Sequence, residues 1–116
     1  MKKLFSFLVF TVFLFGCSHK TKLSLSEISL LGTTWNYTDK DRNYEIEFSK
    51  KGKLITTHPN DHTPNNDTWK QKGDKIHFEF NDGFSKYDGQ FESINLIKGT
   101  AKNSVSNWKW TMKRAK

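Results

Sequence analysis

The sequence predicts an all-β protein: one small antiparallel up-and-down β-barrel of about eight strands, after an N-terminal signal helix that is cleaved. Two observations carry this prediction. From residue 33 onward, short segments alternate apolar and polar side chains, and no stretch has the apolar spacing of a helix. Short connections rich in Gly, Asn and Asp separate the segments, which favours a meander of hairpins over a Greek key. A chain of 116 residues allows one domain, and closing the sheet removes its exposed edges.

The first half of this domain predicts four strands. Residues 27–31 precede Gly32 and predict one helical or 3₁₀ turn before the first strand. Lys51-Gly52 predicts the turn into a strand over residues 54–57, and Gly73 ends the fourth strand. The side chains that share the apolar faces of these strands are Trp35 and Tyr37, then Tyr44, Ile46 and Phe48, and then Trp69.

The second half predicts four more strands. Asn81-Asp82-Gly83 is a strong turn signal, because these residues tolerate positive φ. The segment before it alternates most cleanly, and residues 94–101 predict a less regular strand. The apolar faces here carry Ile76, Phe78 and Phe80, then Tyr87 and Phe91, and finally Trp108, Trp110 and Met112.

The N-terminus is typical of an export signal. Lys2 and Lys3 precede twelve residues, 4–15, that are almost all apolar. This run is too short for a membrane span, which needs about 20 apolar residues. Leu14, Gly16 and Cys17, the only cysteine, resemble the lipobox of bacterial lipoproteins. The alternative is an ordinary secretory signal with a cysteine nearby by chance.

The lipobox resemblance implies lipidation of Cys17. It divides the chain into a signal peptide (1–16), a lipidated cysteine with a flexible tether (17–29) and a barrel domain (30–116). Two or more acyl chains give stable anchoring, so the membrane is an expected partner. Ser18 follows the cysteine, and in the familiar sorting pattern a residue other than Asp favours the outer membrane, with the protein facing the periplasm.

A second resemblance concerns the barrel. Gly32-Thr33-Thr34-Trp35, after a short turn, is similar to the Gly–Trp signature that opens lipocalin-like (calycin-type) barrels. The later segments 73–76, 87–89, 97–101 and 108–110 resemble small bacterial lipocalin-like proteins, whose functions are mostly uncharacterised. The resemblance implies that Arg114 packs over Trp35.

Eight-stranded barrels either fill with side chains or hold one small ligand, and both possibilities stay open from the sequence. Aromatic residues suit the wall of an apolar pocket, but they also make an ordinary core. If a cavity exists, we expect a small hydrophobic or amphipathic ligand. The residues that we expect to line it are Trp35, Trp69, Trp108 and Trp110.

Sites for chemistry are weak in this sequence. His58, Asp61 and His62 lie in the loop of residues 58–67, but no further ligand or supporting residue is visible, so we expect no metal and no cofactor. We interpret this loop as a polar rim of the barrel mouth. His77 alternates with apolar neighbours and is expected to face solvent. No nucleophile, phosphate loop or carboxylate pair is recognisable, so we expect no enzyme activity.

The charge balance changes once the signal is removed. Loss of Lys2 and Lys3 lowers the net charge from +7 to +5. Nucleic-acid binding would also require exposed stacking aromatics, which this domain needs inside, so no nucleic-acid partner is expected. The hypothesis is a monomeric, lipid-anchored envelope protein that binds a small hydrophobic ligand in or at the mouth of the barrel. The alternative is a protein-interaction or inhibitor-type module with a filled barrel.

Overall fold

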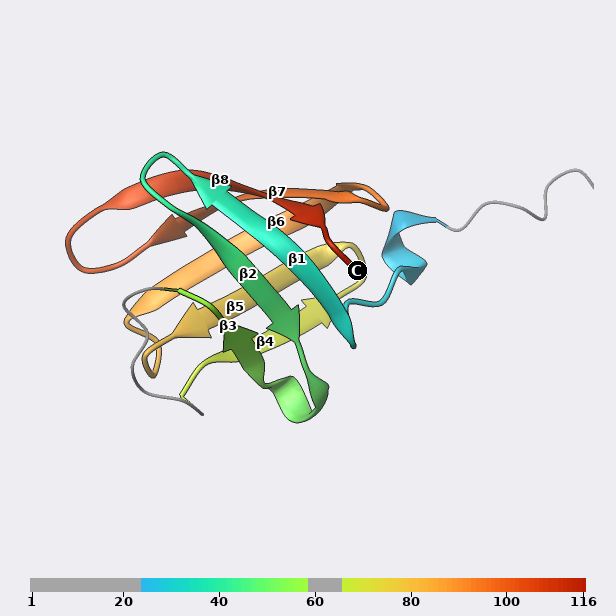
Figure 1. Ribbon diagram of the computed structural model, residues 1–116, viewed down its shortest axis with the longest axis horizontal. Helices are drawn as coiled ribbons and strands as arrows, with labels where there is room; N and C mark the ends of the chain where they lie inside the picture. Colours follow the sequence, from blue (N-terminus) through green and yellow to red (C-terminus); the bar gives the residue numbers. More distant parts are fainter. Residues whose placement is uncertain (1–23, 59–65) are drawn as a thin grey trace, which may run out of the picture.

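A computed structural model describes residues 24–58 and 66–116, and these residues form an eight-stranded antiparallel sheet curled into a nearly closed barrel (Figure 1). The strands follow one another around the sheet in the order β3-β2-β1-β8-β7-β6-β5-β4. Their bounds are β1 Thr33–Asp39, β2 Asn43–Phe48, β3 Leu54–Thr56, β4 Thr68–Lys72, β5 Lys75–Phe80, β6 Ser85–Ser93, β7 Leu96–Lys102 and β8 Asn107–Arg114. The predicted all-β, up-and-down architecture is confirmed.

The ring of strands closes in two ways. β1 pairs with β2 on one side and with β8 on the other, so the first and last strands are neighbours. The short strand β3 meets β4 through a single bridge between Lys53 and Thr68. Asp67 strengthens this junction, because its carbonyl accepts from the Leu54 N–H (3.2 Å) and its carboxylate accepts from the Asn81 N–H (2.9 Å). The remaining edge is therefore short.

The turns follow the residues that tolerate positive φ. Asn81 and Asp82 both have φ of 55°, and Gly83 has φ of 90°, as the turn signal predicts. The turn predicted over residues 27–31 is a 3₁₀ turn, η2, but it lies earlier in the chain, at Leu25–Glu27. Its start is fixed by Glu27, whose carboxylate accepts from the Ser24 backbone N–H (3.1 Å). The strand predicted at 94–101 begins at Leu96, since residues 94 and 95 form the hairpin turn.

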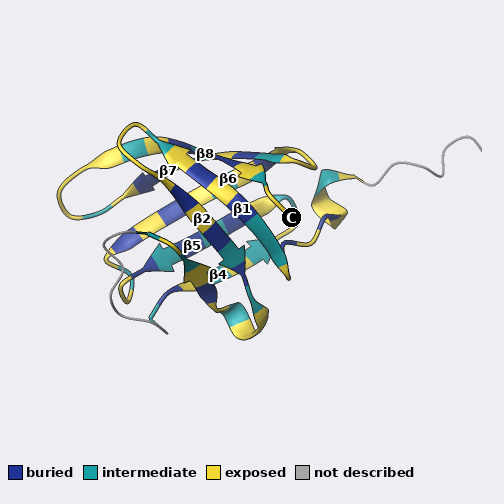
Figure 2. Ribbon diagram, viewed as in Figure 1, coloured by how far each residue is buried: buried dark blue, intermediate teal, exposed yellow. Residues whose placement is uncertain are grey.

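Buried and exposed residues alternate along the strands, so one face of every strand points into the barrel (Figure 2). The interior is filled over most of its length. The side chains with no more than 2% exposure are Leu30, Trp35, Tyr37, Ile46, Phe48, Ile76, Phe78, Phe91, Ile97 and Met112. The hydrogen-bonded ring and its filled core are formed by residues 24–58 and 66–116.

One end of the barrel is closed by the segment that precedes β1. Ile28 and Leu30 are buried there, and Gln71 holds their backbone. The Gln71 side chain accepts from the Leu30 N–H (3.0 Å) and donates to the Ile28 carbonyl. Arg114 lies over the Trp35 ring, 4.7 Å from its centroid, at the same end, which is the contact that the lipocalin resemblance implies. We call this the closed end.

The position of Trp110 explains why glycine stands in the middle of two neighbouring strands. Its indole lies flat against the backbone of Gly89 on β6 and Gly99 on β7, where any Cβ atom would overlap the ring. The indole N–H donates to the Thr100 carbonyl (2.9 Å), which fixes the ring in place. Trp110 is thus a core residue that needs glycine beside it.

Candidate functional site

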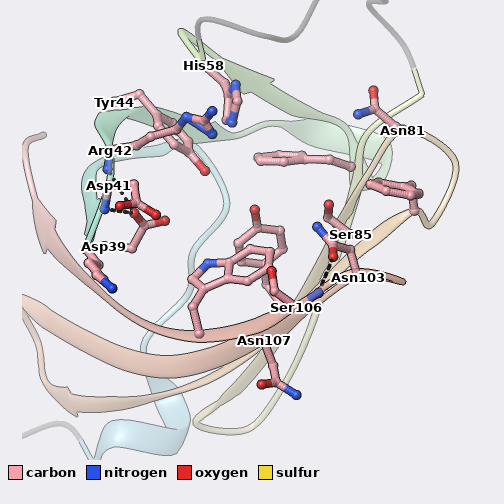
Figure 3. A pocket seen from close by; sticks show the side chains of 15 residues that line it. Asp39, Asp41, Arg42, Tyr44, His58, Asn81, Ser85, Asn103, Ser106 and Asn107 are labelled. Carbon is pink, nitrogen blue, oxygen red and sulfur yellow. Dashed lines mark hydrogen bonds between the residues drawn. The ribbon is translucent and has the colours of Figure 1, made fainter.

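The end of the barrel opposite the closed end carries a pocket of about 500 Å³ (Figure 3). We call this end the mouth. Three hairpin turns surround the pocket: β1–β2, β5–β6 and β7–β8. His58, just after β3, forms another part of the wall. The filled core below makes this a depression in the barrel mouth, and its volume is in the range of small-ligand sites.

Asp39 anchors one wall of the pocket at the end of β1. One carboxylate oxygen accepts from the backbone N–H groups of Asp41 (2.8 Å) and Arg42 (2.9 Å), which fixes the β1–β2 turn. The other oxygen accepts from the Tyr37 hydroxyl (2.6 Å). That hydroxyl in turn accepts from the Trp108 indole N–H (2.9 Å) on β8. A fixed chain of hydrogen bonds therefore links the end of β1, the turn into β2 and the start of β8 along the pocket wall.

The β7–β8 turn is held in the same way. The side-chain oxygen of Asn103 accepts from the N–H groups of Val105 (2.8 Å) and Ser106 (2.9 Å). The Asn103 N–H donates to the Ser106 carbonyl (2.9 Å). The two rim turns nearest the Trp108 side chain are therefore rigid, and the pocket between them is largely preformed.

The hydroxyl of Tyr44 is a polar group at this pocket. Its side chain comes from β2, is 7% exposed, and points its hydroxyl toward the pocket (Figure 3). Within the described residues this buried hydroxyl makes no hydrogen bond of standard geometry, and it interacts with the hydroxyl of Tyr87. Its ring packs between those of Tyr37 (4.5 Å) and His58 (4.6 Å). A buried hydroxyl without such a hydrogen bond costs free energy, so its retention calls for an explanation.

The tyrosine hydroxyls at this end stay protonated. Burial raises the pKa of Tyr44, and the nearby hydroxyls of Tyr87 and Tyr37 raise it further. Burial also raises the pKa of Tyr37, with a contribution from its hydrogen bond to Asp39, and burial raises that of Tyr87. Tyr44 therefore offers a neutral O–H donor at any physiological pH.

The rest of the lining combines aromatic faces with a polar rim. Phe80 and Tyr87 pack against each other with centroids 5.2 Å apart, and Tyr87 meets Trp108 edge to face at 5.7 Å. The polar residues around them are Lys40, Asp41, Arg42, Asn81, Ser85, Ser106 and Asn107. Such a site suits a small molecule with an apolar body and a few polar atoms.

The four tryptophans that we expected to line a cavity lie in different parts of the barrel. Trp108 lines the pocket at the mouth. Trp110 is buried one layer deeper, and Trp35 is fully buried at the closed end. Trp69 is partly buried, packs on Phe48 at 5.4 Å and donates to the Ser49 carbonyl (2.8 Å). Only one of the four faces the pocket within the part of the chain that the structure describes.

The loop considered for metal binding is described only in part. His58 borders the pocket, whereas Asp61 and His62 lie outside the described residues. Within residues 24–58 and 66–116, no group of three His, Cys, Asp or Glu side chains is arranged to hold a metal ion. Cys17 and the predicted signal peptide also lie outside the described residues.

His77 lies on the outer surface of β5, away from the pocket. Its two ring nitrogens contact the carboxylates of Asp88 on β6 (2.7 Å) and Glu79 (2.6 Å). Partial burial lowers the pKa of His77, but the hydrogen bonds to Asp88 and Glu79 outweigh it, so the pKa is raised. The side chain is about three-quarters buried, which is less exposed than the alternating pattern predicts.

The sequence indicates Tyr44 only as one of many aromatic residues that could line a pocket or fill the core, and it does not predict that the Tyr44 hydroxyl faces the pocket. A signal was present in Asp39-Lys40-Asp41-Arg42, a polar hairpin turn directly beyond Tyr37. Aromatic residues next to such a turn lie at the barrel rim, where a hydroxyl can meet a ligand.

No helix in the described segments has the length and apolar character needed to cross a membrane. Comparison with known proteins returned no matching family model, no matching curated protein and no matching solved structure.

Proposed function

We propose that this chain is a lipid-anchored protein of the cell envelope that binds a small hydrophobic or amphipathic ligand at the mouth of its barrel, without catalysis. The observation that carries the proposal is the Tyr44 hydroxyl, which is buried, faces a pocket of about 500 Å³ and makes no hydrogen bond of standard geometry within the described residues. A ligand that supplies an acceptor atom there removes the cost of the unpaired hydroxyl.

The surrounding residues narrow the chemistry of the ligand. The rings of Tyr87, Phe80 and Trp108 favour a flat or aliphatic body. One acceptor atom is needed to receive the Tyr44 hydroxyl, and the amides and charges of the rim suit further polar groups. We therefore expect an amphipathic molecule that inserts its apolar part and keeps a polar part at the rim.

The binding experiment uses residues 18–116 and two indole N–H resonances in proton–nitrogen NMR spectra. The Trp108 N–H lies beside the pocket, whereas the Trp35 N–H donates to Thr33 at the closed end and serves as the internal reference. Titration with anilinonaphthalene sulfonate, an apolar anion, is expected to shift the Trp108 signal and leave the Trp35 signal in place. Equal movement of both signals, or of neither, would count against a site at the mouth.

A matched pair of variants separates the pocket from general apolar binding. Trp108→Phe removes an indole at the mouth, and Trp69→Phe removes a partly buried indole elsewhere. We expect the first variant to weaken probe binding about tenfold or more, because it loses aromatic area and frees Tyr37 from its donor. The second should bind within about twofold of the wild type. Native mass spectrometry of the wild-type barrel identifies any natural ligand that remains bound.

The anchor is the second part of the proposal and is supported by the lipobox resemblance at Leu14, Gly16 and Cys17. Metabolic labelling of cells with a fatty-acid analogue, followed by separation of inner and outer membranes, tests it. The wild type is expected to be labelled and to fractionate with the outer membrane. A Cys17→Ser protein that stayed equally labelled and membrane-bound would refute the lipid anchor.

The filled core favours one alternative: a protein-interaction or inhibitor-type module that acts through its surface. Ten side chains with almost no exposure leave no room for a ligand deep in the barrel. If no probe shifts the Trp108 resonance and nothing co-purifies with the barrel, surface recognition becomes the preferred function.

A further inference from the structure

Charge is distributed unevenly around the outside of the barrel. The outward side chains of β1, β2 and β3 include Glu45 and Glu47 but no lysine or arginine. The outward side of β6, β7 and β8, which we call the β6–β8 face, has two carboxylates, Asp88 and Glu92. The lysines on this face are Lys86, Lys98, Lys102, Lys109 and Lys113.

Three of these lysines gather around a shallow hollow near the mouth. Lys86, Lys102 and Lys109 line a surface depression of about 490 Å³, together with Thr100 and Asn107. Lys86 and Lys102 are directly opposite each other on β6 and β7, an arrangement that is repulsive. None of the three forms an ion pair with a carboxylate of the described residues.

One carboxylate offsets part of this charge. Asp88 borders the hollow, where its carboxylate lies 2.7 Å from His77, but five lysines against Asp88 and Glu92 leave the face with an excess of positive charge. The face therefore presents unneutralised positive charge, which is complementary to an anionic surface.

Two exposed apolar side chains lie at the mouth edge of the same strands. Phe84, in the turn before β6, is 51% exposed, and Val105, in the turn between β7 and β8, is 84% exposed. Large apolar residues at loop tips beside lysines are the combination that binds the interface of a lipid bilayer. The lysines meet the headgroups, and the apolar tips enter the boundary beneath them.

We propose that the β6–β8 face docks on the surface of an anionic lipid bilayer, with Lys86, Lys102 and Lys109 on the headgroups and Phe84 and Val105 inserted at the edge. This contact is separate from the N-terminal anchor and adjoins the pocket at the mouth, since Phe84 and Asn107 border that pocket as well. It orients the barrel with its side on the membrane and places the mouth next to the lipid.

A bilayer fits this face better than a nucleic acid does. Single-stranded nucleic acid is held by exposed aromatic rings that stack on bases, and the one aromatic side chain that lines the hollow, Trp108, is partly buried in the core. Lysine also acts as a point charge on a flexible stem, which suits mobile lipid headgroups. The exposed apolar tips suit the boundary beneath those headgroups.

The test measures binding of residues 18–116, which lack Cys17 and the predicted signal, to sedimented vesicles. Phosphatidylcholine vesicles with about one third phosphatidylglycerol are compared with pure phosphatidylcholine vesicles. The wild type is expected to bind the anionic vesicles, to bind the neutral ones at least tenfold more weakly, and to dissociate as salt is raised.

Two triple variants with equal loss of charge locate the contact. Lys86→Gln/Lys102→Gln/Lys109→Gln is expected to weaken binding to anionic vesicles roughly 100-fold, at about fivefold per lysine. The control removes three exposed lysines outside this face, Lys50, Lys70 and Lys72, of which the last two lie on β4, opposite β8 in the ring. The control variant should bind anionic vesicles at most about fivefold more weakly than the wild type, because its three lysines contribute only to the long-range attraction.

A further variant, Phe84→Ser/Val105→Ser, tests insertion. It is expected to lose about tenfold in binding while keeping the salt dependence, because the lysines remain. The docking mode is wrong if both triple variants lose binding equally, if neutral vesicles bind as well as anionic ones, or if the serine variant binds like the wild type. Stronger competition by single-stranded DNA than by phosphatidylglycerol vesicles would assign the face to nucleic acid instead.

Discussion

The Tyr44 hydroxyl gives the sharpest prediction. Removing it should raise the stability of the ligand-free protein and lower the affinity for the ligand. The side chain is 7% exposed and its hydroxyl makes no hydrogen bond of standard geometry within the described residues. A buried hydroxyl left unpaired costs about 1–3 kcal/mol. Tyr44→Phe deletes that oxygen and keeps the ring between Tyr37 and His58, so the free energy of unfolding should rise by about 1–3 kcal/mol.

The matched control is Tyr37→Phe, a neighbouring tyrosine whose hydroxyl is fully engaged. That hydroxyl donates to Asp39 (2.6 Å) and accepts from the Trp108 indole (2.9 Å). Its removal leaves both partners without their bond, so the free energy of unfolding should fall by about 1–3 kcal/mol. Two Tyr→Phe changes on adjacent strands are therefore expected to have opposite signs.

Urea unfolding followed by tryptophan fluorescence measures both variants, and a thermal scan should show midpoint shifts of about 4–8 °C per kcal/mol in opposite directions. In the ligand titration, Tyr44→Phe should bind an acceptor-bearing ligand about 2–10-fold more weakly, which corresponds to one hydrogen bond. A Tyr44→Phe protein that loses stability as Tyr37→Phe does would show that the hydroxyl is already bonded. The observation that carries the proposed function would then be lost.

Three further predictions concern the barrel itself and are measured by urea unfolding. His77→Gln should abolish a pH-dependent stabilisation: because the folded-state pKa is raised, the stabilisation is full below about pH 6.5 and disappears as the pH rises through the folded pKa. Identical pH profiles for both proteins would contradict it. Gly99→Ala should destabilise by about 1–3 kcal/mol or more, since its Cβ would overlap the Trp110 indole and the β6 backbone, and a neutral result would show that this packing is loose. Arg114→Gln should lower the free energy of unfolding by about 1–2 kcal/mol, whereas Arg114→Lys, which keeps the charge over Trp35, should lose less.

The sequence alone determined the fold class, because strand alternation and turn chemistry are local. Trp35 and Tyr37 are two residues apart and so must share a face, and Asn81-Asp82-Gly83 permits a tight turn wherever it stands. Eight such strands joined by short turns leave an up-and-down meander as the simplest arrangement. The turn predicted at residues 27–31 lies at Leu25–Glu27 instead, because the Ser24 N–H and the Glu27 carboxylate fix its start.

The tertiary structure alone decided where along the barrel each inward side chain lies. Alternation gives the face of a strand but not the height, which depends on the stagger between neighbouring strands. Trp35 and Trp108 both point inward, yet one is at the closed end and the other at the mouth. The same stagger brings Tyr37, Asp39 and Trp108 together and leaves the Tyr44 hydroxyl without a hydrogen bond of standard geometry within the described residues, because cross-strand contacts join residues that are up to 71 positions apart in the chain.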